Sequence, residues 1–178
     1  MTDEQPGLRP HPQTLGFRLG WASRALLWLR TTEALAGSTE LGEQLLSPVA
    51  LFLCLQDAFL LVHGKSAGSS LIVLGDDEAL VGCPYTRDEL QALLKRARGL
   101  RDEVLHLSTK LHPGRQLEIS WTHESPYLTV RTSVGPGNTF VFQSITKPEM
   151  TDILENLKPW LRRQAERLTK EKEAMDDS

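Results

Sequence analysis

The chain has little cysteine and no long uninterrupted apolar segment. Cys54 and Cys83 are the only two cysteines among 178 residues, and neither has Cys-x-x-Cys or Cys/His spacing. The sequence therefore indicates no structural zinc, no disulfide framework and no cofactor. The most apolar stretch, 48–62, is interrupted by Gln56 and Asp57, and no run of eighteen apolar residues occurs. Because the first residues also lack the pattern of a signal peptide, we expect a cytoplasmic protein without a membrane span.

The chain also lacks an overall excess of positive charge, since its net charge is −3. The charges are unevenly distributed, however. Segment 86–115 holds seven basic and four acidic residues, a balance of +3. The basic residues in this segment that could contact phosphate groups are Lys95, Arg98, Lys110 and Arg115. The segment is either a phosphate-binding patch or an ordinary solvated helix face, and the composition alone leaves both open.

Periodic apolar residues predict two helices in the first third of the chain. The first covers about 21–36, and the second covers about 39–63. Gly64 is a natural stop for the second helix, and Pro48 should kink or split it. The Gly/Ser-rich segment that follows, up to residue 84, should be a loop with at most a short strand.

Two further helices begin with recognisable caps. Segment 86–89 has the Thr-x-x-Glu pattern of a capping box, which predicts a third helix over about 86–108. Segment 146–149 repeats the pattern and starts the last helix. Pro159 should bend this last helix, and its charged end after Lys170 should fray.

Between the last two helices the apolar period changes to two. The stretches 117–121, 127–131 and 139–143 alternate apolar and polar residues and are separated by turn residues, which predicts a three-stranded antiparallel meander. The expected fold is therefore mainly α: a four-helix bundle with a small three-stranded antiparallel sheet inserted before the last helix.

This fold implies a simple organisation along the chain. Residues 1–14 are polar and Pro-rich and should form a loose N-terminal tail, and residues 173–178 should form a frayed C-terminus. Residues 15–172 should form one helical domain that includes the strand meander at 116–143.

The third predicted helix carries the most chemically capable residues of the chain, Arg101, Asp102 and His106. Arg101 stays charged and suits phosphate, whereas His106 titrates near neutral pH and can move a proton. Asp102 and His106 are i and i+4 neighbours, so the carboxylate can orient the imidazole. Arg101 falls within the sector of the apolar stripe, where an Arg needs a partner, a substrate or a route to solvent. These three residues could together cleave a phosphodiester without a metal.

Arg101 and His106 do not converge from one straight helix. They are about 7.5 Å apart in rise and roughly 140° apart around the axis. Two copies of helix 86–108 packed about a two-fold axis would bring Arg101 of one copy near His106 or Asp102 of the other. A homodimer through this helix is therefore part of the hypothesis, and it would also relieve the desolvation of Arg101.

The pattern Arg101-Asp102-x-x-x-His106, near the end of a helix in a small helical bundle, resembles the HEPN superfamily. The resemblance is supported by helices across about 21–172. It implies an all-α, typically dimeric protein, and in many cases a metal-independent ribonuclease that acts as a toxin or as an antiphage or abortive-infection effector. Arg101 would then stabilise the scissile phosphate, Asp102 would orient the imidazole of His106, and His106 would be the general acid or base.

The chain departs from the HEPN pattern in two places. Asp102 stands where Asn is commonest, which places negative charge close to the expected RNA phosphate, and the strand meander elaborates the simple bundle. Some HEPN proteins serve only as dimerisation or partner-binding modules, and this is the alternative function. The resemblance also allows an antitoxin or a nucleotidyltransferase as a partner.

Overall fold

The computed structural model of the protein describes residues 12–67, 71–74, 76–105, 117–120, 127–134 and 139–177. Its helices are α1 (Pro12–Gly37), α2 (Leu41–His63), α3 (Asp77–Leu80), α4 (Arg87–Leu105) and α5 (Lys147–Asp176). The expected mainly α class is confirmed. The described residues hold five helices where the sequence predicts four, because the single turn α3 carries no apolar period of its own.

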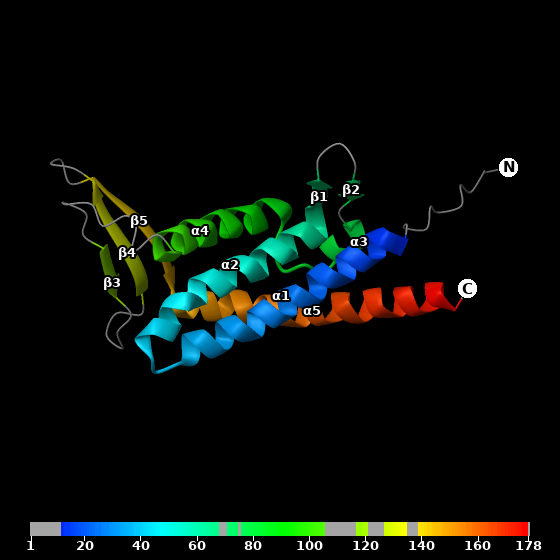
Figure 1. Ribbon diagram of the computed structural model, residues 1–178, viewed down its shortest axis with the longest axis horizontal. Helices are drawn as coiled ribbons and strands as arrows, with labels where there is room; N and C mark the ends of the chain where they lie inside the picture. The colour runs from blue at the N-terminus through cyan, green and yellow to red at the C-terminus, as the bar shows by residue number, and fades with distance from the viewer. Residues whose placement is uncertain are drawn as a thin grey trace.

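The four long helices run side by side in alternating directions (Figure 1). α2 packs on α1 on one side and on α4 on the other, and α5 packs on α1. Their buried side chains form one apolar core, to which α5 contributes Ile153, Leu157, Trp160 and Leu161 at three- and four-residue steps. This spacing places the residues on one face of the helix, and each fully buried Leu contributes roughly 1.5–3 kcal/mol of apolar burial.

Several helix boundaries differ from those that the sequence predicts. α1 begins at Pro12, so that the end of the supposed loose tail is helical. α5 continues to Asp176 through Pro159, and α2 continues through Pro48 without splitting. In α2 and α5 a continuous buried face on neighbouring turns compensates for the hydrogen bond that the internal proline removes.

α2 is the most apolar helix and the centre of the bundle. It ends, as predicted, at Gly64, whose φ of 76° is the conformation that glycine adopts most readily. Within the described residues, the stretch Gly42–His63 is the one helix long and apolar enough to cross a membrane, yet most of it is buried within the bundle. The burial agrees with the predicted buried helix.

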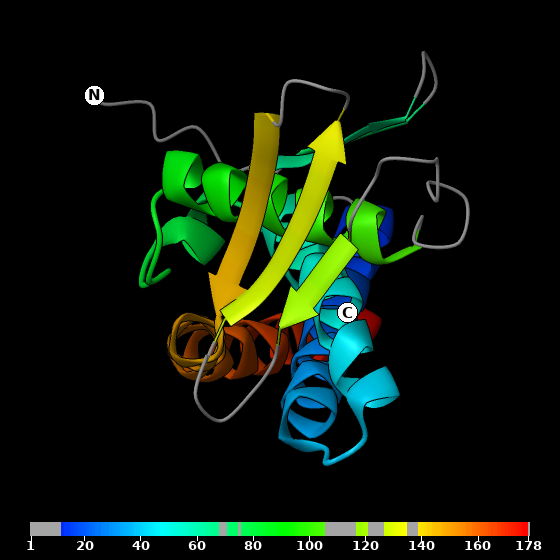
Figure 2. The ribbon, with the colours of Figure 1, turned by 90° about the vertical axis from the view of Figure 1, so that its left-hand side faces the viewer.

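The strands form two small antiparallel sheets. β1 (Gly64–Ala67) and β2 (Leu71–Leu74) make a hairpin directly after α2, in a segment where the sequence predicts mainly loop. β3 (Leu117–Ser120), β4 (Tyr127–Val134) and β5 (Thr139–Thr146) pair in the order β3-β4-β5. Figure 2 shows these three strands at one end of the bundle. The end of α4 and the beginning of α5 lie at the same end (Figure 1).

Candidate functional site

α4 carries the part of the motif that the structure describes, and its local sequence explains why it is a helix. The Thr86 amide donates to Glu89 Oε2 at 2.8 Å, and the Glu89 amide donates to Thr86 Oγ1 at 3.3 Å. The predicted capping box is thus confirmed. Leu90, Ala97 and Leu100 are fully buried, so one face of α4 is fixed against the core.

Arg101 lies at the edge of this buried face, in the last turn of α4. Its guanidinium carbon lies 4.1 Å from the centroid of the Phe52 ring on α2, which is a cation–π contact. Arg101 Nε donates to Asp102 Oδ1 at 2.9 Å, and Nη2 donates to the same oxygen. The Arg101 side chain keeps 23% exposure and that of Asp102 keeps 42%. The charged guanidinium is therefore held in one place, mostly covered by protein and still partly open to solvent.

This geometry corrects one step of the reasoning from sequence. Desolvation of Arg101 does not require a second subunit, because Phe52 and Asp102 already accommodate the guanidinium within one chain. Asp102, which was expected to orient His106, accepts a hydrogen bond from Arg101, and its expected contact with His106 stays a prediction. His106 lies outside the described residues.

The basic residues of the expected RNA-binding set divide into two groups. Lys95 and Arg98 are exposed on α4, and no ion pair involving either occurs in the part of the chain that the structure describes. Together with Asp102 they follow one face of the helix, at steps of three and four residues. Lys110 and Arg115 lie outside the described residues. The structure thus brings two of the four basic residues to the helix that carries Arg101.

An ion pair joins the middle of α4 to the start of α5. Arg96 donates two hydrogen bonds to the Glu149 carboxylate, at 2.5 and 3.0 Å. The Glu149 amide in turn donates to Oγ1 of Thr146, the last residue of β5, at 3.0 Å. The hydrogen bonds from Arg96 hold the pKa of Glu149 below its ordinary value. Arg96 therefore acts as a structural tie between α4 and α5.

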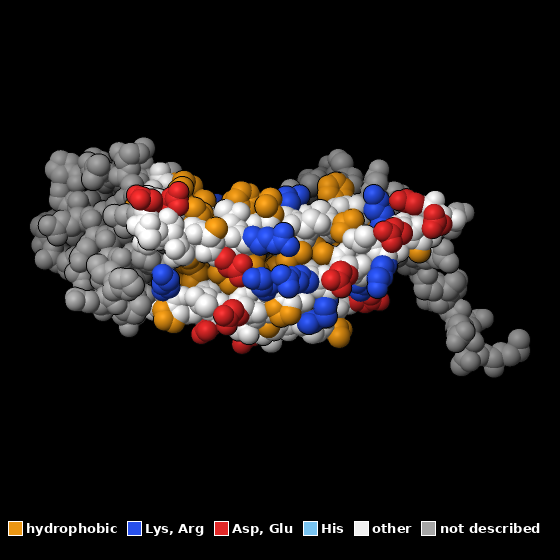
Figure 3. Space-filling view, turned by 90° about the horizontal axis from the view of Figure 1, so that it is seen from below, with side chains coloured by type: hydrophobic (Ala, Val, Ile, Leu, Met, Phe, Trp, Pro, Cys, Tyr) orange, Lys and Arg blue, Asp and Glu red, His pale blue; other side chains and the backbone are white. Residues whose placement is uncertain are grey.

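A second charged cluster lies at the opposite end of the bundle, around Asp76. This carboxylate is 4% exposed; it accepts a hydrogen bond from Arg167, lies 3.8 Å from Nη1 of Arg18, and caps α3 through the Glu78 amide at 3.1 Å. On the face seen in Figure 3, Lys and Arg side chains are interspersed with Asp and Glu side chains. The cluster stabilises the contact between α3 and α5 rather than presenting charge of one sign.

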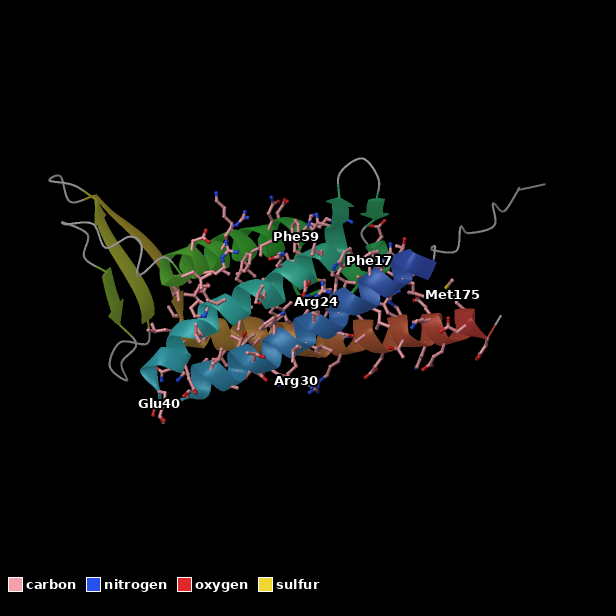
Figure 4. The ribbon with its side chains drawn as sticks, in the orientation of Figure 1. Phe17, Arg24, Arg30, Glu40, Phe59 and Met175 are labelled. Atoms are coloured by element: carbon pink, nitrogen blue, oxygen red, sulfur yellow. The ribbon has the colours of Figure 1, made fainter. Side chains whose placement is uncertain are left out.

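His63 closes α2 beside the start of α4. Its ring stacks on Phe59, with the ring centroids 3.9 Å apart, and Phe59 lies on α2 facing α4 (Figure 4). Its Nε2 is buried and has no hydrogen-bond partner among the described residues. Burial, and secondarily the charge of Arg87, lower the pKa of His63. The neutral ring is therefore the form that the fold favours.

The cysteines do not supply a reactive thiol. Cys54 is fully buried on α2, and burial raises its pKa far above the ordinary range. Burial also raises the pKa of Cys83, which is half-buried. A high pKa keeps both thiols protonated at neutral pH, and a thiol is a poor nucleophile. Within the described residues no group of three or more His, Cys, Asp or Glu side chains is placed to hold a metal ion.

Phe52 is the site residue that sequence reasoning missed. Arg101 and Asp102 are adjacent in sequence and the motif identifies them, but Phe52 lies on another helix among many apolar residues. No sequence pattern distinguishes an aromatic ring that supports a guanidinium from one that packs only in the core. Comparison of the chain with protein-family models, with curated proteins and with solved structures found no match.

Proposed function

We propose that the chain is a metal-independent RNA endonuclease of the HEPN type, acting as a toxin or as an antiphage or abortive-infection effector. The observation that carries the proposal is the fixed guanidinium of Arg101, in van der Waals contact with Phe52 and still 23% exposed. A preorganised, partly dehydrated cation stabilises charge that develops on a phosphate more strongly than a freely moving one does.

In this proposal the chemistry is divided between two residues. His106 deprotonates the ribose 2′-hydroxyl or protonates the leaving 5′-oxygen, which produces 2′,3′-cyclic phosphate ends. Arg101 neutralises the charge on the pentacovalent phosphorane. In the helix that the sequence predicts over 86–108, His106 would lie about 20° around the axis from Lys95. Lys95, Arg98, Lys110 and Arg115 would bind neighbouring phosphates.

The proposal also covers the assembly. The fold would be a bundle of long helices with the β3–β5 meander inserted before α5, and a homodimer would form through helix 86–108. Leu105 supports this interface, because it is a large apolar side chain that remains 54% exposed at the end of α4 beside Arg101. A cytoplasmic location and an antitoxin or nucleotidyltransferase partner belong to the same proposal.

A second function has an observation in its favour. Asp102 already neutralises Arg101, so the charge at the end of α4 is balanced without any ligand. A non-catalytic module, in which α4 serves only as a dimerisation or partner-binding surface, would need only this neutral ion pair and no substrate phosphate. The two functions differ in whether the chain cleaves RNA through Arg101 and His106.

The test is RNA cleavage by the full chain carrying Arg101→Ala or His106→Ala, in buffer containing a chelator. We expect each variant to lose at least about a hundredfold in rate, the scale typical of a lost acid–base or charge-stabilising group. Arg30→Ala is the matched control, because Arg30 is exposed on α1 and points away from the bundle (Figure 4). If both site variants remain folded and cleave RNA like the wild type, the endonuclease proposal is wrong.

A further inference from the structure

The guanidinium of Arg101 already holds an anion in the folded chain, and that anion is its neighbour Asp102. Two donors, Nε and Nη2, converge on one carboxylate oxygen. One face of the guanidinium lies over the Phe52 ring at 4.1 Å. Among the described contacts of Arg101, none uses Nη1. A phosphate that approaches Arg101 must therefore displace Asp102 or lie beside it.

Either arrangement places two negative charges close together or leaves one without its partner. Like charges separated by only a few ångströms at a half-exposed site weaken binding by roughly tenfold or more. A small anion such as inorganic phosphate spans fewer of the exposed basic side chains of α4 than a longer polyanion does, so it offsets less of this cost. A longer polyanion offsets more of it, because the exposed Arg98 and Lys95 follow Arg101 along α4 at steps of about 4.5 Å in rise.

We infer that Asp102 is a specificity-determining residue of the Arg101 site: as an internal counterion it excludes small anions and admits polyanions that also engage Arg98 and Lys95. The inference rests on the proposed function and adds the substrate class to it. Oligonucleotides are favoured over mononucleotides and free phosphate, because only an oligonucleotide places several phosphates along α4. Selectivity of this kind arises from a repulsive element as well as from attractive contacts.

The test is Asp102→Asn in the full chain. Asparagine keeps an oxygen that accepts from Arg101 Nε and Nη2 and removes only the negative charge. Asp102 is 42% exposed, so the substitution does not disturb the core. Asp152→Asn is the matched control, because Asp152 is exposed on α5 and the net charge changes by the same amount. Binding of inorganic phosphate and of a short 2′-O-methylated RNA oligonucleotide, which cannot form the cyclic product, is measured at one fixed ionic strength.

We expect Asp102→Asn to tighten phosphate binding by about tenfold and oligonucleotide binding by less. The ratio of oligonucleotide affinity to phosphate affinity should therefore fall. Asp152→Asn should change neither. If Asp102→Asn leaves phosphate binding unchanged while Arg101→Ala still weakens oligonucleotide binding, the inference is wrong and the proposed function stands. If Arg101→Ala has no effect on oligonucleotide binding, the inference is wrong, and the proposed function fails as well only if Arg101→Ala leaves RNA cleavage unchanged.

Discussion

The contact between Arg101 and Phe52 predicts a measurable coupling in stability. The perturbation is a double-mutant cycle of Phe52→Leu and Arg101→Met. Leucine removes the aromatic ring but stays apolar, and methionine removes the charge of Arg101 but keeps a similar side-chain length. Phe52→Leu should cost less than the about 3–5 kcal/mol of a Phe→Ala truncation, because leucine fills most of the space. Arg101→Met also removes the ion pair to Asp102, but that carboxylate is 42% exposed, so the loss is about 0–1 kcal/mol.

The coupling itself follows from the geometry of the contact. A cation over an aromatic face contributes about 0.5–1 kcal/mol at an exposed site and about 2 kcal/mol when desolvated. The Arg101 side chain is 23% exposed and its guanidinium carbon lies 4.1 Å from the ring centroid, so we expect a coupling of about 1 kcal/mol. Urea unfolding of the wild type, the two single variants and the double variant, followed by circular dichroism, measures it.

The matched control is the cycle of Phe52→Leu with Arg98→Met. Arg98 is exposed and lies on the same helix, one turn earlier, so its coupling to Phe52 should be close to zero. A coupling between Phe52 and Arg101 within about 0.3 kcal/mol of zero would refute the claim that the ring holds the guanidinium.

Three further predictions concern the groups that hold the fold together. Asp76→Ala should lower the free energy of unfolding by about 3 kcal/mol, because it removes the α3 cap and leaves Arg167 without its buried partner. The ion pair between Glu149 and Arg96 should contribute its full stabilisation above the ordinary Glu pKa of 4.5, and this stabilisation should be lost as the pH falls through the lowered pKa. Arg96→Met should make the free energy of unfolding depend less on pH in this range. His63 has a lowered pKa, so stability should decrease as the pH falls below the ordinary value of 6.5, and His63→Gln should remove this decrease.

Urea unfolding across pH tests these three predictions together. Glu155→Gln, at an exposed residue of α5, is the control for the acidic range. The reasoning on Glu149 is wrong if Arg96→Met leaves the acid dependence unchanged, and that on His63 is wrong if His63→Gln loses stability below pH 6.5 as the wild type does. A loss of less than about 1 kcal/mol in Asp76→Ala would mean that the cluster is solvated after all.

The features predictable from sequence are those with a local physical cause. Thr86 and Glu89 fix the start of α4 by hydrogen bonds within four residues, and Gly64 ends α2 because its positive φ suits glycine. The position of Arg101 at the edge of the buried face of α4 also follows from helical periodicity, since residues 90, 97 and 104 define that face.

The features missed from sequence depend on packing between distant segments. The last helix was expected to fray after Lys170, but α5 continues to Asp176, with Leu168 buried and Met175 packed against the core. The hairpin that follows Gly64 pairs two four-residue strands, which are too short for a clear alternation of apolar residues. The contact of Phe52 with Arg101 joins residues on two helices, so no local rule predicts it.

The most direct test of the proposed function is the chemistry of the RNA ends that the protein produces. The full chain is incubated with single-stranded RNA in a chelator, and the products are analysed by mass spectrometry. The proposal predicts 2′,3′-cyclic phosphate and 5′-hydroxyl ends that form without metal and disappear in Arg101→Ala. No cleavage, cleavage abolished by the chelator, or 5′-phosphate ends would contradict it.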